Sequence, residues 1–125
     1  MAIGAGYGSS RRILVVDDDE ALCALLADAL GGEENLEVIC AHTDRIAYGL
    51  IPTLPTFRAL VVDVDLGAGT TGFDVARFAR RVIPDLLVIY VSGATSNASL
   101  EAFGVPDAQF LQKPFTPHEL LGRLG

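Results

Sequence analysis

The sequence predicts an α/β protein with a doubly wound parallel sheet of five strands covered by five helices. Short apolar runs alternate with segments whose apolar residues recur at helical spacing, as in repeated strand–helix units. The predicted strands are continuously apolar, which is typical of strands buried on both faces. Of the 125 residues, 50% are hydrophobic and 20% are charged, enough to build one core in a single domain.

Strands are predicted where β-branched and aliphatic residues cluster, over 13–16, 36–41, 59–62, 86–91 and 109–112. Helices are predicted after them, over 22–30, 43–50, 75–83, 97–103 and 117–124. The first ten residues, 1–10, are rich in Gly, Ser and Ala without any period. We treat them as a flexible arm or a cloning remnant, outside the fold.

Apolar spacing and breaker residues support the individual helices. The first helix ends at Gly31-Gly32, and its apolar stripe is Leu22, Leu25, Leu26, Ala29 and Leu30. The second helix is closed by Pro52 and Pro55. The third stops at Pro84, and its apolar stripe is Val75, Phe78, Ala79, Val82 and Ile83. The last helix spans about two turns and presents Leu120, Leu121 and Leu124.

The acidic balance limits the classes of partner. Acidic residues outnumber basic ones by 16 to 9, for a formal net charge of −7. A field of this sign disfavours binding to DNA or to an anionic membrane. No apolar run approaches the ~18 residues of a membrane span. We therefore expect a cytoplasmic domain in which the two cysteines, Cys23 and Cys40, are reduced and serve packing.

Polar residues follow four of the five predicted strands. Ligands of open parallel sheets bind at the carboxyl ends of the strands, near the topological switch point. The residues at these ends are Asp17, Asp18 and Asp19 after the first strand, Asp63 after the third, Ser92 after the fourth and Lys113 after the fifth. The second strand ends in His42-Thr43 and offers less.

Together these side chains suit phosphoryl chemistry. Clustered carboxylates repel one another and stay ionised only beside a cation, and oxygen ligands with an incomplete shell suit Mg²⁺. An aspartate beside Mg²⁺, a lysine and a hydroxyl can accept a phosphoryl group. Taken singly, such an aspartate is more often a helix cap or a solvated turn, and we assign Asp19 to the cap of the first helix.

Three segments resemble the signatures of response-regulator receiver domains of two-component signalling. They read ILVVDD over 13–18, LVVD over 60–63 and FLQKPF over 110–115, and the resemblance covers residues 12–124. It implies a flavodoxin-like sheet in the order 2-1-3-4-5 and a receiver domain over 11–125, like the chemotaxis receivers.

The resemblance also implies roles for the acidic residues. Asp63 would be the phosphoacceptor nucleophile and a direct ligand of Mg²⁺. Asp18 would bind the ion directly and Asp17 largely through water. Asp65 would supply a backbone carbonyl to the same ion. A metal-free site would leave these carboxylates uncompensated.

The same resemblance assigns the remaining site residues. Ser92 corresponds to the switch hydroxyl, Gly93 to a small residue that keeps the site open, and Lys113 to the phosphate-contacting lysine. The bond between Lys113 and Pro114 is expected to be cis. Phe110 stands where the family often has tyrosine, so we expect a switch that works by packing rather than through a hydroxyl.

Two further departures from the family pattern concern the loop after Asp63 and the last helix. The loop, 64–72, is one residue longer than the commonest form and lacks its usual proline. The last helix is short, so the chain could have been cut from a hybrid kinase or a multidomain regulator, or could stand alone.

Other motifs favour plain structural roles. Residues 67–72 match G-x-G-x-x-G after a strand, but Asp63 and Asp65 would repel a pyrophosphate, and no acidic residue ends the following strand. We expect His42 and His118 at the surface. The arginines of the third helix are expected to form a solvated face; they are Arg77, Arg80 and Arg81.

The predicted function is therefore that of a receiver in a two-component system or phosphorelay. Asp63 would take a phosphoryl group from a phosphohistidine of a histidine kinase or a histidine phosphotransfer protein, with Mg²⁺, and would switch a protein-binding face. The domain would catalyse only its own phosphorylation and dephosphorylation. Two alternatives stay open: a receiver-like interaction module that works without phosphorylation, and a metal-dependent phosphatase with Asp65 as its second acid.

Overall fold

The computed structural model describes residues 11–31, 36–53, 57–66, 71–93 and 97–124, with the backbone alone for 97–99. The predicted arm, 1–10, lies outside this set. The strands are β1 (Arg11–Val16), β2 (Leu36–Ala41), β3 (Phe57–Asp63), β4 (Leu87–Ser92) and β5 (Gln109–Gln112). The helices are α2 (Glu20–Leu30), α3 (Asp44–Leu50), α4 (Gly72–Val82), α5 (Asn97–Phe103) and α6 (Pro117–Leu124).

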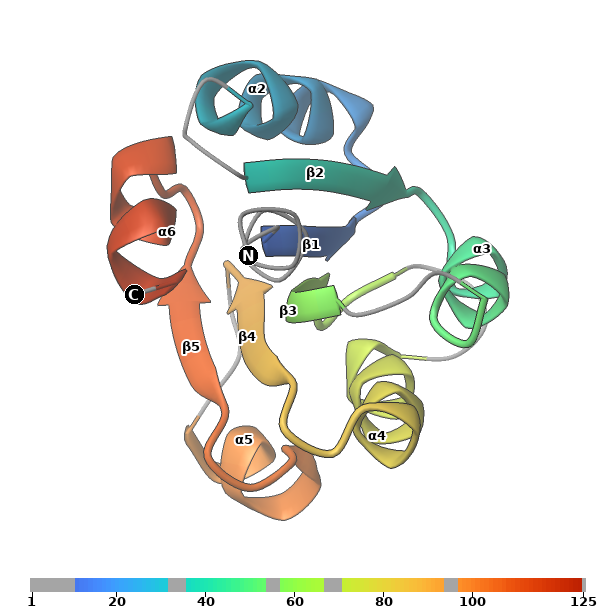
Figure 1. Cartoon of the computed structure of the whole chain (residues 1–125). Helices are drawn as coiled ribbons and strands as arrows, with labels where there is room; N and C mark the ends of the chain where they lie inside the picture. Colours follow the sequence, from blue (N-terminus) through green and yellow to red (C-terminus); the bar gives the residue numbers. More distant parts are fainter. Residues whose placement is uncertain (1–10, 32–35, 54–56, 67–70, 94–96, 125) are drawn as a thin grey trace, which may run out of the picture.

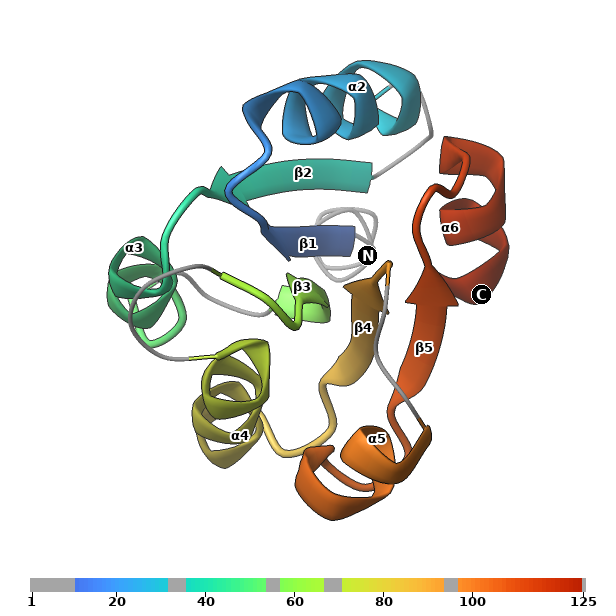
Figure 2. The same cartoon turned by 180° about the vertical axis from the view of Figure 1, so that it is seen from behind.

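The strands form one parallel sheet in the order β2-β1-β3-β4-β5, which confirms the predicted topology. Helices α2 and α6 cover one face of the sheet, and α3, α4 and α5 cover the other (Figure 1). The same two layers are visible from behind in Figure 2. The chain runs outward from β1 to β2 and then returns past β1 to β3. The switch point therefore lies between the carboxyl ends of β1 and β3.

Alternating side chains of the central strands pack into two separate cores, one on each face of the sheet. In β1, Leu14 and Val16 pack toward α3 and α4, whereas Ile13 and Val15 pack toward α2 and α6. β3 and β4 follow the same alternation, so both faces of each strand are buried. This double burial explains why these strands are continuously apolar in sequence.

The buried face of α2 differs from the predicted stripe. Cys23, Leu26 and Leu30 are its buried residues, whereas Leu25 is 50% exposed and Ala29 is exposed. The helix is mostly Ala and Leu on every side, so spacing alone does not determine which face turns inward. The prediction for Leu25 and Ala29 was wrong, and the exposed Leu25 becomes part of a surface groove described below.

The arginines of α4 are also more than a solvated face. Arg77 donates to the Phe103 carbonyl oxygen at 2.9 Å and pairs with Asp74. Arg80 donates to the carbonyl oxygens of Leu86 and Pro106, each at 2.8 Å. Both side chains therefore tie α4 to the segments that flank β4, and only the exposed Arg81 fits the prediction.

Cys23 and Cys40 are joined in a disulfide that links α2 to β2. The prediction of two reduced thiols is therefore wrong for this structure. Their sequence separation of 17 residues hides the pairing, because only the packing of α2 against β2 brings their Cα atoms to 6.2 Å.

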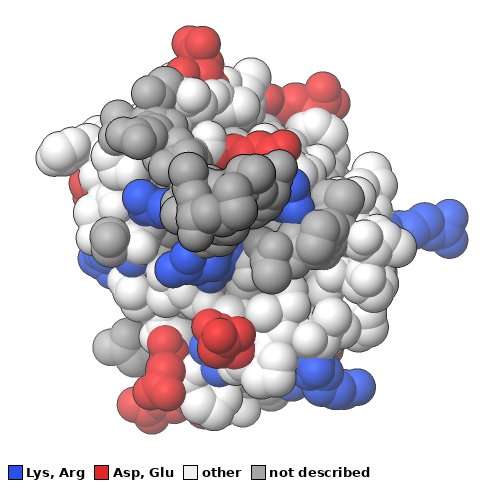
Figure 3. Space-filling view, viewed as in Figure 1, with Lys and Arg blue, Asp and Glu red and all other residues white. Residues whose placement is uncertain are grey.

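No helix among the described residues is both long and apolar enough to traverse a bilayer. Charges of both signs are scattered over the face seen in Figure 3. The acidic excess of the chain therefore does not form one continuous acidic surface on that face.

Candidate functional site

Backbone hydrogen bonds hold the carboxyl ends of the five strands together. The Asp17 amide donates to the Ala41 carbonyl oxygen at 3.1 Å, which joins the ends of β1 and β2. Val64 donates to Val91 at 3.0 Å, which joins β3 to β4. Beyond β5, the Lys113 amide donates to the Ser92 carbonyl oxygen at 3.0 Å. The polar residues that follow these strands are thus fixed at one edge of the sheet.

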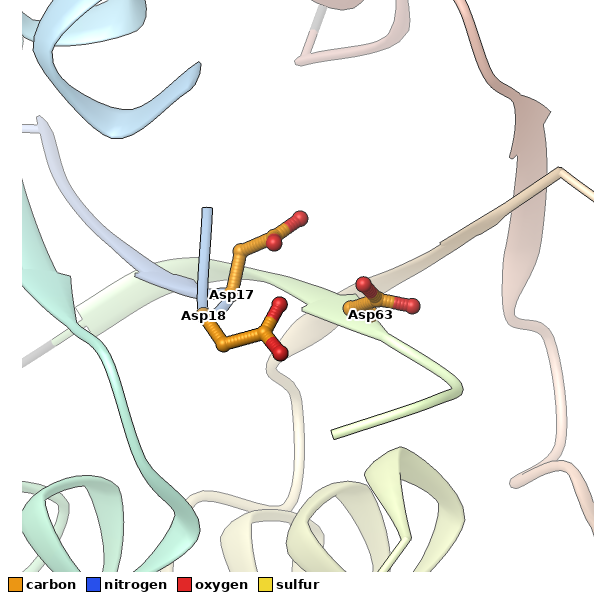
Figure 4. Close-up of side chains that lie close together, drawn as sticks. All are labelled: Asp17, Asp18 and Asp63. Atoms are coloured by element: carbon orange, nitrogen blue, oxygen red, sulfur yellow. The ribbon is translucent and has the colours of Figure 1, made fainter. Parts of the chain in front are cut away.

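Three aspartates converge at the switch point. One oxygen each of Asp17, Asp18 and Asp63 lies within 4.8 Å of the others. Figure 4 shows the carboxylates of Asp17 and Asp18 extending toward the side on which Asp63 lies. Asp17 is 1% exposed and Asp63 is buried, whereas Asp18 is exposed. The cluster is therefore a pocket with a buried floor and an open mouth.

Each buried carboxylate accepts a backbone N–H from two residues further on. Asp17 Oδ1 accepts from the Asp19 amide, and Asp63 Oδ1 accepts from the Asp65 amide, both at 2.9 Å. These bonds fix the carboxylates locally. They also leave the second oxygen of each, Oδ2, directed toward the lysine that follows β5.

Lys113 bridges the two buried carboxylates. Its Nζ lies 2.7 Å from Asp17 Oδ2 and 3.0 Å from Asp63 Oδ2. Burial alone lowers the pKa of Lys113, but the contacts with Asp17 and Asp63 outweigh it and raise the pKa above its ordinary value. Lys113 is therefore charged at neutral pH and already points at the predicted phosphoacceptor.

The pKa of Asp63 is raised above its ordinary value. Burial is the main cause, and the neighbouring charge of Asp17 acts in the same direction. The hydrogen bonds from Lys113 and the Asp65 amide lower the pKa without cancelling the increase. Lys113 contacts two of the three clustered carboxyl groups, and the three together exceed its single positive charge.

This donor set fits a divalent cation. Carboxylate oxygens are hard ligands, and three of them from two strand ends would leave room for waters or phosphoryl oxygens, as Mg²⁺ prefers. A cation bound there would also relieve the repulsion that helps to raise the pKa of Asp63. Asp18 lies at the open mouth, where such an ion would enter.

The other predicted site residues lie in β4 and β5 or directly after these strands. Ser92 is the last residue of β4 and is 3% exposed. A Cβ added to Gly93 would have no atom within 4 Å, so the space beside it is open. Phe110 is half-buried in β5, paired with Tyr90 of β4. The peptide bond between Lys113 and Pro114 is cis, as expected.

Several smaller expectations are also answered. Asp19 is the N-cap of α2, and its side chain accepts from the Leu22 amide at 3.0 Å, as predicted. His42 is not simply a surface residue, because its Nδ1 lies 3.4 Å from the Asp17 carbonyl oxygen. Asp65 is exposed. Most of the G-x-G-x-x-G motif, 67–70, lies outside the described residues.

The start of α4 lies beside the end of β3, and sequence reasoning missed it by placing the helix over 75–83. Thr71 and Asp74 form a capping box that starts the helix directly beside the end of β3. The Gly72 amide donates to the Val64 carbonyl oxygen at 3.1 Å. The T-x-x-D spacing of Thr71 and Asp74 was the available signal for this helix start.

The family model of the response regulator receiver domain matches residues 13–125 of the chain. The chain belongs to this family. Its fold and its acidic cluster agree with that membership, and receiver domains are signalling modules of two-component systems. The resemblance seen in the three sequence signatures is thereby confirmed.

Individual relatives agree with the family. The receiver is 38% identical over 121 residues to the transcriptional regulatory protein TcrA of Mycobacterium tuberculosis, covering 95% of this chain and 46% of that protein. It thus spans about half the length of this curated relative.

Solved structures of the family superimpose closely. A response regulator receiver protein from Sinorhizobium medicae matches with a TM-score of 0.82 and 26% identity, over 92% of this chain and 91% of that chain. A response regulator from Burkholderia pseudomallei, whose crystal structure holds a phosphorylated aspartic acid, a calcium ion and citrate, matches with a TM-score of 0.80 and 26% identity. That match covers 92% of this chain and 66% of that chain.

Proposed function

We propose that this receiver accepts a phosphoryl group on Asp63 and transmits its presence to a protein partner. The observation that carries the proposal is the placement of Asp63 Oδ2, 3.0 Å from Lys113 Nζ and beside Asp17 and Asp18. A nucleophilic carboxylate, a fixed cation and an acidic metal pocket are the parts that aspartyl phosphorylation needs. The phosphorylated aspartic acid in the Burkholderia pseudomallei structure supports the assignment by similarity.

Mg²⁺ is the proposed metal. Asp18 and Asp63 would bind it directly, Asp17 through water and Asp65 through its backbone carbonyl. When bound, the ion would neutralise charge on the carboxylates and on the incoming phosphoryl oxygens. Lys113, which contacts Asp63 Oδ2, would neutralise a further phosphoryl oxygen.

The proposed transfer is a displacement at phosphorus. A carboxylate oxygen of Asp63 forms a bond to phosphorus while the bond from phosphorus to the histidine nitrogen of the donor breaks. The donor imidazole leaves with the bonding electron pair and takes up a proton. The chain contributes position and charge, because Lys113 and the Asp65 amide already hold the two oxygens of Asp63 in place.

The proposed donor is a histidine kinase or a histidine phosphotransfer protein in the cytoplasm. A groove of about 550 Å³ lies beside the pocket, and it is lined by Asp19, Ala21, Leu22, Leu25, Lys113, Pro114 and Phe115. The groove is mainly apolar and adjoins Lys113, so a donor helix seated there would bring its histidine close to Asp63. Leu25→Asp would slow phosphotransfer from such a donor and leave phosphorylation by acetyl phosphate unchanged.

The proposed switch runs from Ser92 to Phe110. Ser92, Tyr90 and Phe110 lie on the same face of the sheet, because Ser92 pairs with Gln112 and Tyr90 with Phe110. The Tyr90 hydroxyl accepts from the Val105 amide at 3.1 Å, which fixes its ring. A cavity of about 120 Å³ lined by Tyr90 and Phe110 gives the phenyl ring room to move.

In this switch, Ser92 donates to the new phosphoryl oxygens and moves toward them. The phenyl ring of Phe110 then fills the space that Ser92 leaves beside the end of β4. Burying an exposed phenyl contributes about 1.5–3 kcal/mol, comparable to the few kcal/mol between the states of a typical switch. The responsive surface would comprise α5, β5 and α6. Amide NMR with beryllofluoride, a phosphoryl mimic, tests this. We expect shifts at Ser92 and over 110–121, and shifts confined to the Asp63 loop would contradict it.

Intact mass spectrometry tests the function itself. With acetyl phosphate and Mg²⁺, we expect one added mass of about 80 Da, that of a single phosphoryl group, and no adduct when the metal is chelated. Absence of any adduct would favour an interaction module that works without phosphorylation. Continuous release of phosphate from many esters would favour a phosphatase.

A further inference from the structure

The disulfide between Cys23 and Cys40 lies next to the acidic pocket. Cys23 is the fourth residue of α2, at the end of its first turn. Cys40 is the last but one residue of β2, which is an edge strand. Cys23 is 1% exposed, whereas Cys40 is only half-buried. The cross-link therefore lies between α2 and the edge of the sheet, with Cys40 as its less buried end.

Each half of the disulfide connects to the acidic loop through hydrogen bonds that backbone amides donate. The Cys23 amide donates to the Asp19 carbonyl oxygen at 3.2 Å, and the Asp19 amide donates to Asp17 Oδ1 at 2.9 Å. On the other side, Ala41 follows Cys40 directly and accepts from the Asp17 amide at 3.1 Å. The loop that carries Asp17 and Asp18 is thus enclosed in a ring that the disulfide closes covalently.

We propose that Cys23 and Cys40 form a reversible dithiol–disulfide pair whose oxidation strengthens cation binding by Asp17, Asp18 and Asp63. In the oxidised form, α2 and β2 cannot separate at this point, so the acidic loop is ordered before the ion arrives. In the reduced form, part of the binding free energy is spent on ordering the loop, and the apparent affinity is lower. The cation-binding half of this inference rests on the proposed function, whereas the redox half does not.

The redox step is a thiol–disulfide exchange with a dithiol, either a protein or a small molecule. A thiolate of the dithiol attacks Sγ of Cys40, the less buried of the two cysteines, the S–S bond breaks, and Cys23 leaves as a thiolate that takes up a proton. The second thiol of the reductant then displaces Cys40 and closes its own disulfide. Two electrons and two protons pass from the dithiol to the cysteine pair, and the reverse reaction restores the cross-link.

Alkylation followed by intact mass spectrometry tests the redox half. The whole chain is equilibrated with mixtures of reduced and oxidised dithiothreitol, and free thiols are then counted. As the mixture becomes more reducing, we expect the number of free thiols per chain to rise from none to two in a single transition. The protein should stay monomeric throughout. Two free thiols in the fully oxidising mixture, or a disulfide only between chains, would overturn the proposal.

Calorimetric titration with MgCl₂ tests the coupling. We expect the oxidised protein to bind Mg²⁺ about fivefold more tightly than the reduced protein, at the lower end of typical coupling between sites. The double variant Cys23→Ala, Cys40→Ala should bind like the reduced protein in every mixture. Equal affinities in the two wild-type forms would overturn the coupling and leave the magnesium site intact. Absence of binding in both forms would overturn the coupling and the proposed metal site together.

Discussion

Gly72 lies against the backbone of Asp63, and a Cβ at position 72 would be 2.1 Å from the Asp63 carbonyl oxygen. The same Cβ would lie 2.8 Å from the Asp63 carbonyl carbon. No side chain fits there unless the start of α4 moves away from the end of β3. The last glycine of the G-x-G-x-x-G motif is therefore explained by close packing against the end of β3, without a bound nucleotide.

Gly72→Ala should destabilise the fold, because the clash is with backbone atoms that cannot rotate aside. We expect a loss of about 1–3 kcal/mol in the free energy of unfolding, measured with urea. Gly49→Ala is the matched control, since a Cβ at Gly49 in α3 would meet nothing within 4 Å. That variant should gain up to about 1 kcal/mol from helix propensity. Equal effects of the two variants would refute the packing argument.

Asp63→Asn should stabilise the metal-free protein at neutral pH. A carboxyl group whose pKa is raised by folding favours the folded state in its protonated form. That contribution is present below its ordinary pKa of 3.8 and is lost as the pH rises through the raised value. Ionised Asp63 therefore costs stability at pH 7, and asparagine removes the cost.

Thermal unfolding at several pH values checks this prediction. The melting temperature of Asp63→Asn should exceed that of the wild type at pH 7, and the difference should shrink as the pH falls toward 3.8. Asp65→Asn removes the same charge at an exposed position and should gain less. A gain that does not depend on pH would contradict the assigned cause.

Mg²⁺ should stabilise the fold, because the proposed site exists only where the native sheet brings the carboxylates together. At ten times its dissociation constant, a single bound ion contributes about 1.4 kcal/mol, which is readily measured as a rise in melting temperature. Asp18→Asn should abolish most of that rise, since Asp18 is exposed and can be changed without harming the core. Asp28→Asn, an equal change of charge on the exposed side of α2, should retain it.

Arg80→Ala should destabilise the fold more than Arg81→Ala. Arg80 donates to two backbone carbonyl oxygens, those of Leu86 and Pro106, and thereby ties α4 to both ends of the β4–α5 region. We expect a loss of about 1–2 kcal/mol in urea denaturation. Arg81 is exposed, and its replacement should change stability by less than about 0.5 kcal/mol. Similar losses in both variants would mean that helix propensity, not the carbonyl contacts, is being measured.

The architecture and the core of the site could be predicted because they follow from local patterns. Continuous apolar strands imply a parallel sheet, and the carboxyl ends of parallel strands meet at one edge. Asp17 and Asp63 could therefore be placed together although 46 positions separate them in the numbering. The same logic brought Ser92 and Lys113 to that edge.

Features that depend on three-dimensional contacts could not be predicted. The stripe of α2 was misjudged because nearly all of its residues are apolar, and burial of Cys23 rather than Leu25 is decided by packing on β1 and β2. The partners of Arg80 are carbonyl oxygens up to 26 residues away, and no sequence motif indicates such contacts. The disulfide has the same origin, since its two cysteines meet only through the packing of α2 on β2.

Mapping of the phosphoryl group tests the central claim most directly. The protein would be treated with acetyl phosphate and Mg²⁺, the acyl phosphate would be reduced with borohydride, and the modified residue would be located by peptide mass spectrometry. We predict modification at Asp63 alone, complete loss of the adduct in Asp63→Asn and full retention in Asp65→Asn. An adduct on Asp65, or one that persists in Asp63→Asn, would contradict the account.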